Sequence, residues 1–186
     1  VGSEMCIRDR IHAENLTTLK LPNTLVDLGQ GAITTPNAES IDFGNSLKNI
    51  NMNFMQLNKL QELNIPKTIE SINVSFSTCS ALKTLNISGD NFTSIKSSFQ
   101  DNQMLESLTL NGKDLIIEQS FNKAPSLKEI NFSGVKTIKN SFWECNMDKL
   151  VIPEGITEIS NSFGTFNGTE LTLPNSLTVF DYSFNN

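Results

Sequence analysis

Apolar residues recur along the chain in two alternating patterns, and both patterns repeat every 20 to 23 residues. The first pattern is a pair of apolar residues separated by one other residue, which is typical of a half-buried β-strand. These pairs are Leu19/Leu21, Ile41/Phe43, Leu63/Ile65, Leu85/Ile87, Leu108/Leu110, Ile130/Phe132, Leu150/Ile152 and Leu171/Leu173. The second pattern is a phenylalanine with an apolar residue four positions before it. The phenylalanines are Phe54, Phe76, Phe99, Phe121, Phe142, Phe163 and Phe184, preceded by Ile50, Ile72, Ile95, Ile117, Ile138, Ile159 and Phe180.

The unit spanning residues 60–81 shows how the two patterns combine. Its apolar pair predicts a short strand, and Pro66 ends the strand because proline has no N–H for a ladder hydrogen bond. Ile69 and Ile72 then provide a second inward-facing segment, and Ser75-Phe76 predicts a short turn or helical piece. A unit this short cannot bury its own apolar residues, so the units must stack on one another.

Stacked units predict a repeat solenoid with its parallel strands about 4.8 Å apart. Equivalent phenylalanine rings then form a column along the solenoid axis. A serine precedes each phenylalanine except Phe54, which follows Asn53, and we expect these side chains to bond the backbone of the turn. The serines are Ser75, Ser98, Ser120, Ser141, Ser162 and Ser183. A row of catalytic serines is the alternative interpretation, but the repeats contain no histidine that could act as a base.

The repeated pattern LxxLxIPxxIxxIxxSFxxC resembles the BspA-like leucine-rich repeat, and LVDLGQGAI at residues 25–33 comes nearest to its usual form. Two features depart from the family: the asparagine that commonly follows LxL is absent, and serine mostly replaces alanine before the phenylalanine. The resemblance implies a leucine-rich-repeat-like, right-handed, β-rich solenoid of about eight units with a parallel sheet on one face. It also implies a cell-surface or secreted protein that binds host macromolecules or other cells.

Residues 1–10, VGSEMCIRDR, share no periodicity with the rest of the chain. The nucleotide string GTGGGCTCGGAGATGTGTATAAGAGACAG encodes the first nine of these residues in its first frame, and its last two bases followed by any purine encode Arg10. The string resembles an adapter used to build sequencing libraries. We therefore interpret residues 1–10 as a non-native, adapter-derived segment. Residues 11–186 are interpreted as a BspA-like solenoid that is incomplete at both ends. A natural N-terminal arm is the alternative.

Charge and motifs exclude several functions. The net charge is −6 without any cluster of lysines or arginines, which argues against nucleic acid and anionic lipid as partners. No membrane span is visible, and His12 is the only histidine. No phosphate loop, catalytic triad or metal-ligand spacing occurs, so we predict no catalytic, cofactor-binding or metal-binding residues and no enzymatic activity. Cys79 and Cys145 lie three units apart, roughly 14 Å, so we expect buried thiols that form no disulfide.

The outward residues of the strands form the candidate binding face, an extended concave surface. The candidate residues are Glu62, Asn64, Thr84, Asn86, Ser107, Thr109, Glu129 and Asn131. Trp143 is a candidate exposed aromatic residue, and its packing beside Phe142 is the alternative. The leading hypothesis is a non-catalytic binding or adhesion module for a protein or other cell-surface macromolecule. Two alternatives remain open: a structural spacer or stalk, and the recognition arm of an enzyme whose catalytic domain lies elsewhere.

Overall fold

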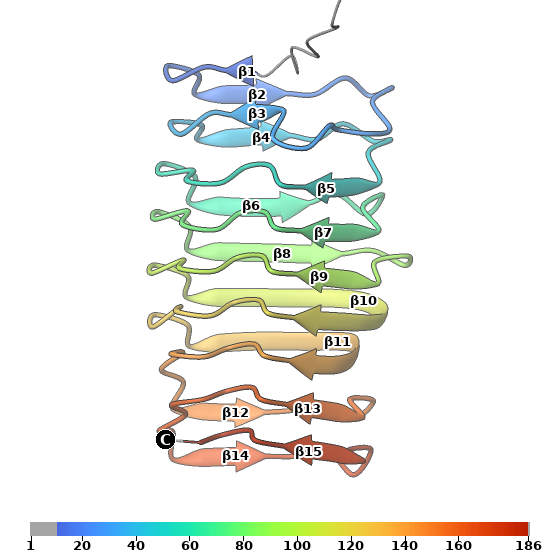
Figure 1. Ribbon diagram of the computed structural model, residues 1–186, viewed down its shortest axis with the longest axis vertical. Coiled ribbons are helices and arrows are strands. Elements are labelled where there is room, and N and C mark those ends of the chain that lie inside the picture. The colour runs from blue at the N-terminus through green and yellow to red at the C-terminus, as the bar shows by residue number, and fades with distance from the viewer. Residues whose placement is uncertain (1–10, 186) are drawn as a thin grey trace, which may run out of the picture.

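The structure, a computed structural model, describes residues 11–185, and this range contains β-strands and loops but no helix. The predicted adapter-derived segment, residues 1–10, lies outside the described residues. The strands are β1 (Ile11–His12), β2 (Thr18–Lys20), β3 (Ile33–Thr34), β4 (Ser40–Asp42), β5 (Asn49–Asn51), β6 (Glu62–Ile65), β7 (Ser71–Asn73), β8 (Thr84–Ser88), β9 (Ser94–Lys96), β10 (Ser107–Glu118), β11 (Glu129–Lys139), β12 (Lys149–Val151), β13 (Glu158–Ser160), β14 (Glu170–Thr172) and β15 (Val179–Asp181). In Figure 1 successive turns of the chain stack along the long axis of the molecule.

The predicted solenoid of parallel strands is confirmed. The first residue of every apolar pair lies on a strand. Neighbouring strands pair in the expected register, so that Leu63 is opposite Leu85, and Leu85 is opposite Leu108. We call the outer side of these strands (β2, β4, β6, β8, the first halves of β10 and β11, β12 and β14) the strand face. All strand pairs in the described range are parallel.

A second column of strands runs along the solenoid, where the sequence predicted only an inward-facing segment (Figure 1). It contains β5, β7, β9, the second halves of β10 and β11, β13 and β15. Its central residues are the apolar residues that precede each phenylalanine, in continuous register: Ile50, Ile72, Ile95, Ile117, Ile138, Ile159 and Phe180. Each turn from β4 onward therefore contributes strand residues to two columns, and the side chains between these columns form the core.

Glycine or proline occupies the corner between the two columns. Pro66 follows the last residue of β6, as predicted. The long strands β10 and β11 instead pass around the corner without interruption, at Gly112 and Gly134. Gly134 has a φ of +66°, and a Cβ atom there would collide with the carbonyl oxygen of Gly112. The close approach of two turns thus requires glycine at this corner.

The predicted phenylalanine column fills the core. Successive rings from Phe54 to Phe184 stack with centroids 5.0–5.3 Å apart and planes within 10° of parallel. The rings from Phe54 to Phe163 are at most 1% exposed. The spacing is set by the strand ladders, which keep equivalent residues of neighbouring turns close to the hydrogen-bonding distance.

The five residues centred on each stacked phenylalanine form a segment that we call the phenylalanine arc. Of the two options predicted for it, the structure shows a turn and no helical piece. In residues 74–78, Val74, Phe76 and Thr78 have φ angles of 47°, 58° and 57°. The same three positions have positive φ in the arcs centred on Phe54, Phe99, Phe121, Phe142 and Phe163. Ordinary residues rarely adopt this conformation, which costs roughly 1–2 kcal/mol per residue.

Hydrogen bonds between turns hold the arcs in place. The Val74 N–H donates to the Lys96 carbonyl at 2.9 Å, and the Thr78 N–H donates to the Gln100 carbonyl at 2.8 Å. These bonds satisfy backbone groups that a helix or sheet would otherwise pair. The strained backbone is therefore stabilised by the neighbouring turns and not by contacts within the arc itself.

The serines before the phenylalanines form the predicted structural ladder. Ser98 is typical: its hydroxyl accepts a hydrogen bond from the Ser75 N–H at 3.1 Å and donates one to the Lys96 carbonyl at 2.6 Å. Equivalent bonds occur at every serine from Ser75 to Ser183. Asn53 takes the serine's place at the start of the ladder, where its Oδ1 accepts from the Ile33 N–H.

Candidate binding face

The eight predicted face residues lie together on the outer side of β6, β8, β10 and β11, which pair in that order. They form two adjacent columns in register, which we call the polar grid: Glu62, Thr84, Ser107 and Glu129 in one column, and Asn64, Asn86, Thr109 and Asn131 in the other. The residues on β6 and β11 are exposed, and those on β8 and β10 are half-buried.

Hydrogen bonds within the polar grid orient some of its side chains. The Asn86 amide donates to Asn64 Oδ1 at 3.0 Å, and the Asn64 amide in turn donates to Glu62 Oε1 at 2.9 Å. Asn131 donates to Glu129 in the same way, at 3.2 Å. The carboxylates at the two sides of the grid are therefore bonded to amides of their own strands. The hydroxyls of the central strands are left to bond water or a ligand.

Charged residues on the strand face outside the polar grid pair with each other. Lys20 and Asp42 lie 3.5 Å apart on β2 and β4, and Lys149 and Glu170 lie 3.0 Å apart on β12 and β14. The hydrogen bond that Lys149 donates to the Glu170 carboxylate raises the pKa of Lys149. Such exposed pairs contribute little to stability, but they neutralise both ends of the face. The polar grid between them has two carboxylates, Glu62 and Glu129, at its sides and no charged side chain on its central strands β8 and β10.

Cys79 and Cys145, the two cysteines in the described part of the chain, are buried, free thiols, as predicted. Burial raises the pKa of both Cys79 and Cys145 to about 12, so neither is a thiolate nucleophile at neutral pH. Cys79 and Cys145 each lie three residues after a stacked phenylalanine, and Asn102 has the same position after Phe99. The sequence analysis gave Asn102 no role. Asn102 is fully buried; its Oδ1 accepts from the Cys79 N–H at 2.8 Å, and its amide donates to the Phe76 carbonyl at 3.1 Å.

Trp143 is half-buried on the outer side of its arc. Its indole Nε1–H donates to the Asn161 carbonyl at 2.8 Å, and its ring lies against Gly164, the equivalent residue of the next turn. The ring therefore packs on the following turn, and only part of it reaches the surface. Trp143 belongs to the arcs and does not lie on the strand face with the polar grid.

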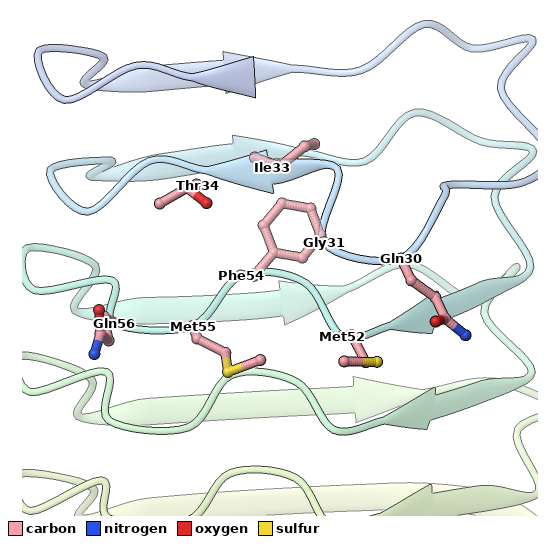
Figure 2. Close-up of a pocket in the computed structure, with 8 residues that line it drawn as sticks. All are labelled: Gln30, Gly31, Ile33, Thr34, Met52, Phe54, Met55 and Gln56. Atoms are coloured by element: carbon pink, nitrogen blue, oxygen red, sulfur yellow. The ribbon is translucent and has the colours of Figure 1, made fainter. Parts of the chain in front are cut away.

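Figure 2 shows a hollow of about 390 Å³ on the arc side of the molecule, between β3 and the arc that follows β5. Phe54 points from this arc toward Ile33, and the partly exposed Met52 and Met55 lie beside it (Figure 2). The hollow occurs where the phenylalanine column begins, because GQGAIT at residues 29–34 lacks the Ser-Phe pair of the later turns. That missing pair is the sequence signal that could have located it.

Within residues 11–185, no group of three or more histidine, cysteine or acidic side chains is arranged to hold a metal ion. The same range contains no helix that is long and apolar enough to cross a membrane.

Comparison with known families decides what kind of protein this is. Residues 11–114 and 93–186 match the family model described as BspA type leucine rich repeat region, which comprises six copies of the repeat. The chain belongs to the BspA-type leucine-rich repeat family. Proteins of this BspA-type family are repeat proteins often used for binding or adhesion, are typically not enzymes, and in bacteria are typically at the cell surface or secreted. The family thus agrees with the fold and with the general class of function predicted from the sequence.

A solved leucine-rich repeat protein from Bacteroides ovatus is similar to this BspA-type chain, with a TM-score of 0.45 and 21% sequence identity. The match covers 89% of this chain and 57% of that protein, so the chain spans little more than half of its length. A search of curated proteins finds no match.

Proposed function

We propose that this BspA-type chain is a non-catalytic binding or adhesion module of a cell-surface or secreted protein, and that the polar grid contacts a macromolecular partner. The observation that carries the proposal is the register of the grid. Eight polar side chains from four neighbouring strands form two continuous columns on one surface. An extended surface of this kind is how solenoids present binding sites.

The strand ladder supports this proposal because it makes the grid rigid. Its backbone is held by hydrogen bonds on both sides of β8 and β10, so little conformational entropy is lost when a partner binds. The central hydroxyls and amides can both donate and accept hydrogen bonds. The grid has a polar, uncharged centre and the carboxylates of Glu62 and Glu129 at its sides. It therefore favours a polar protein surface over a strongly acidic partner, because like charges repel across an interface.

Two other functions were open from the sequence, a spacer or stalk and the recognition arm of an enzyme. A spacer requires only that the turns stack, and it would tolerate any soluble replacement in the polar grid. A recognition arm would use the grid as proposed here but would act on behalf of a second domain. Replacing grid residues therefore separates a binding role from a spacer.

The test compares two double variants of equal added charge. Asn86→Lys with Thr109→Lys places two lysines in the centre of the polar grid, and Ser94→Lys with Thr137→Lys places two on the second strand column. Binding of the labelled chain to intact cells is measured by flow cytometry, with and without protease treatment of the cells. We expect the grid variant to bind at least about tenfold more weakly, a change of about 1.4 kcal/mol, while the control variant and the wild type bind alike.

Protease treatment of the cells should abolish binding of the wild type, because the proposed partner is a protein. Equal binding by both double variants would contradict the assignment of the polar grid. Absence of saturable binding to any cell type tested would favour the spacer.

A further inference from the structure

The hollow between β3 and the arc centred on Phe54 marks an interruption in the column of arcs (Figure 2). In the turn that contains β3, the Ile33 N–H donates to Asn53 Oδ1 at 3.1 Å. The Ser75 N–H makes the corresponding ladder bond in a later turn. Ile33 therefore has the register of a ladder serine, but the residue after it is Thr34 and not a phenylalanine. This turn contributes no ring and no arc, and a hollow of about 390 Å³ takes their place.

The interruption also leaves one backbone acceptor of the Phe54 arc without its usual partner. In each later arc whose phenylalanine is stacked, the carbonyl of the residue after the phenylalanine accepts an N–H of the preceding arc, at 2.6–3.2 Å. These carbonyls belong to Ser77, Gln100, Asn122, Trp143, Gly164 and Asn185. Met55 has the same position after Phe54, but no group of residues 11–185 donates a hydrogen bond to its carbonyl.

Proline at the donor position accounts for the missing bond. The donor of each arc lies three residues after the ladder residue, as Gln56 lies three residues after Asn53. Three residues after Ile33 stands Pro36, which has no N–H to donate. Because the equivalent carbonyls all face the preceding turn, the Met55 carbonyl faces β3 and the hollow, which Met55 lines. It is therefore available to a donor that enters the hollow.

The lining of the hollow is apolar and uncharged. Ile33 and Phe54 are buried at its floor, and the side chains of Met52 and Met55, 43% and 38% exposed, lie beside them (Figure 2). The remaining lining residues are Gln30, Gly31, Thr34 and Gln56. Methionine thioethers adapt their shape and make favourable contacts with aromatic rings. The volume is near the lower end of the roughly 300–1,000 Å³ of small-molecule sites, so the hollow accepts a short segment and not a folded domain.

We propose that this hollow binds an uncharged peptide segment of a partner protein, with an aromatic side chain between Met52 and Met55 and the N–H of the next residue donated to the Met55 carbonyl. The segment supplies what the turn lacks, a ring and a backbone donor. Peptides that add to an open backbone edge gain affinity from main-chain hydrogen bonds and specificity from a side-chain pocket. The site lies on the arc side of the molecule, so it is separate from the polar grid and does not depend on it.

The test follows the methyl signals of the methionines by NMR in the intact chain. The probe is acetyl-Ser-Phe-Ser-amide. One control peptide has alanine in place of phenylalanine, and the other is N-methylated at the amide after phenylalanine, which removes the donor. We expect saturable shifts of the Met52 and Met55 signals, while Met104, which is 42% exposed, and the buried Met147 stay unchanged. Both control peptides should bind at least about tenfold more weakly.

Three results would overturn the proposal. The first is the absence of saturable shifts of Met52 and Met55 with the phenylalanine peptide, or equal shifts of Met104. The second is equal affinity for the N-methylated peptide, which would show that the Met55 carbonyl takes no part in binding. The third is a change of the Met52 and Met55 signals on dilution of the chain without peptide, which would assign the hollow to a second copy of the chain.

A double variant locates the site on the protein. Met52→Ala with Met55→Ala removes both thioethers, and unchanged Met104 and Met147 signals would show that the variant is folded. Saturation-transfer NMR of the peptide should show at least about tenfold weaker binding, and undiminished binding would refute the site. Met104→Ala, at a residue of similar exposure, is the matched control and should bind like the wild type.

The grid variant with Asn86→Lys and Thr109→Lys separates this proposal from the function proposed above. It should bind the peptide like the wild type although its binding to cells is weakened. The double methionine variant should retain the contacts of the polar grid. Failure of one proposal is therefore distinguishable from failure of the other.

Discussion

The two sides of each turn, the strand face and the phenylalanine arc, achieve the same stacking by different means. On the strand face, ordinary extended residues alternate between core and solvent, as in Glu62, Leu63 and Asn64 of β6. In the arc, ordinary residues adopt positive φ, and the core is filled by stacked rings and bonded hydroxyls. The strand face thus resembles any half-solvated sheet, in which outward residues are free to vary. The arc depends on specific side chains, so single substitutions there should have far larger effects.

The largest expected difference is between a ring of the phenylalanine column and a residue of the polar grid. Phe121 is fully buried between Phe99 and Phe142, with ring centroids 5.1 Å away on each side. Phe121→Ala should lower the free energy of unfolding by about 3–5 kcal/mol because it leaves a cavity in the stack. Asn64→Ala on the exposed grid should change it by no more than about 0.5 kcal/mol. Urea denaturation of both variants measures the difference. Comparable losses of unfolding free energy would show that the strand face tolerates substitution no better than the arc.

The next effect concerns the serine ladder. The Ser120 hydroxyl accepts from the Ser98 N–H at 3.1 Å and donates to the Glu118 carbonyl at 2.8 Å, in a fully buried position. Ser120→Ala leaves that N–H without a partner and should cost about 1–3 kcal/mol in unfolding free energy. Ser107→Ala in the polar grid is the matched control. It should leave the unfolding free energy nearly unchanged, because water can bond any group that the Ser107 hydroxyl leaves free. If Ser120→Ala left the unfolding free energy unchanged, the serine ladder would not contribute to stability.

The smallest effect should differ in sign between the two sides. Val74 is a β-branched residue at a φ of 47°, a conformation that asparagine tolerates much better; Asn140 and Asn161 occupy the same position in other arcs. We therefore expect Val74→Asn to raise the free energy of unfolding by about 0.5–1 kcal/mol, since part of the strain of roughly 1–2 kcal/mol is relieved.

The same substitution on the strand face is the control. Val151 is 59% exposed on β12, where extended backbone favours β-branched residues, so Val151→Asn should destabilise by less than about 1 kcal/mol. Thermal unfolding of both variants measures the change in stability, which should be a gain for Val74→Asn and a loss for Val151→Asn. A loss of stability in both would indicate that contacts of Val74, and not its backbone conformation, dominate at the arc.

Much of this contrast could be predicted from the repeated residues. The apolar pairs predicted the strands, and the constant spacing of Phe76, Phe99 and Phe121 predicted a column of rings. The recurring Ser-Phe pair also predicted a ladder with a structural role. These predictions succeed because units of equal length that pair side by side must place equivalent residues next to each other. The polar grid follows from the same register, although its use in binding stays a prediction.

Other features depend on contacts between turns and could not be read along one unit. Ile69 and Ile72 did not reveal that the second segment forms strands, because a short apolar spacing fits several conformations. The positive φ of Val74 is stabilised by a carbonyl of the next turn, and a local pattern favours a strand for valine. No pattern along the chain distinguishes Asn102, because its partners, the Cys79 N–H and the Phe76 carbonyl, lie in the preceding turn.

The sequence by itself determined the repeat, its length and the register of its columns. Units of nearly equal length place equivalent residues beside each other as soon as the turns stack. The tertiary structure decided the conformation of each arc, the tight corner at Gly112 and Gly134, and the placement of Trp143 on Gly164. Trp143 and Gly164 are 21 positions apart and meet only because two turns are stacked. Strain at positive φ and the fit of a ring on a glycine are set by neighbouring turns, so they exist only once the solenoid has formed.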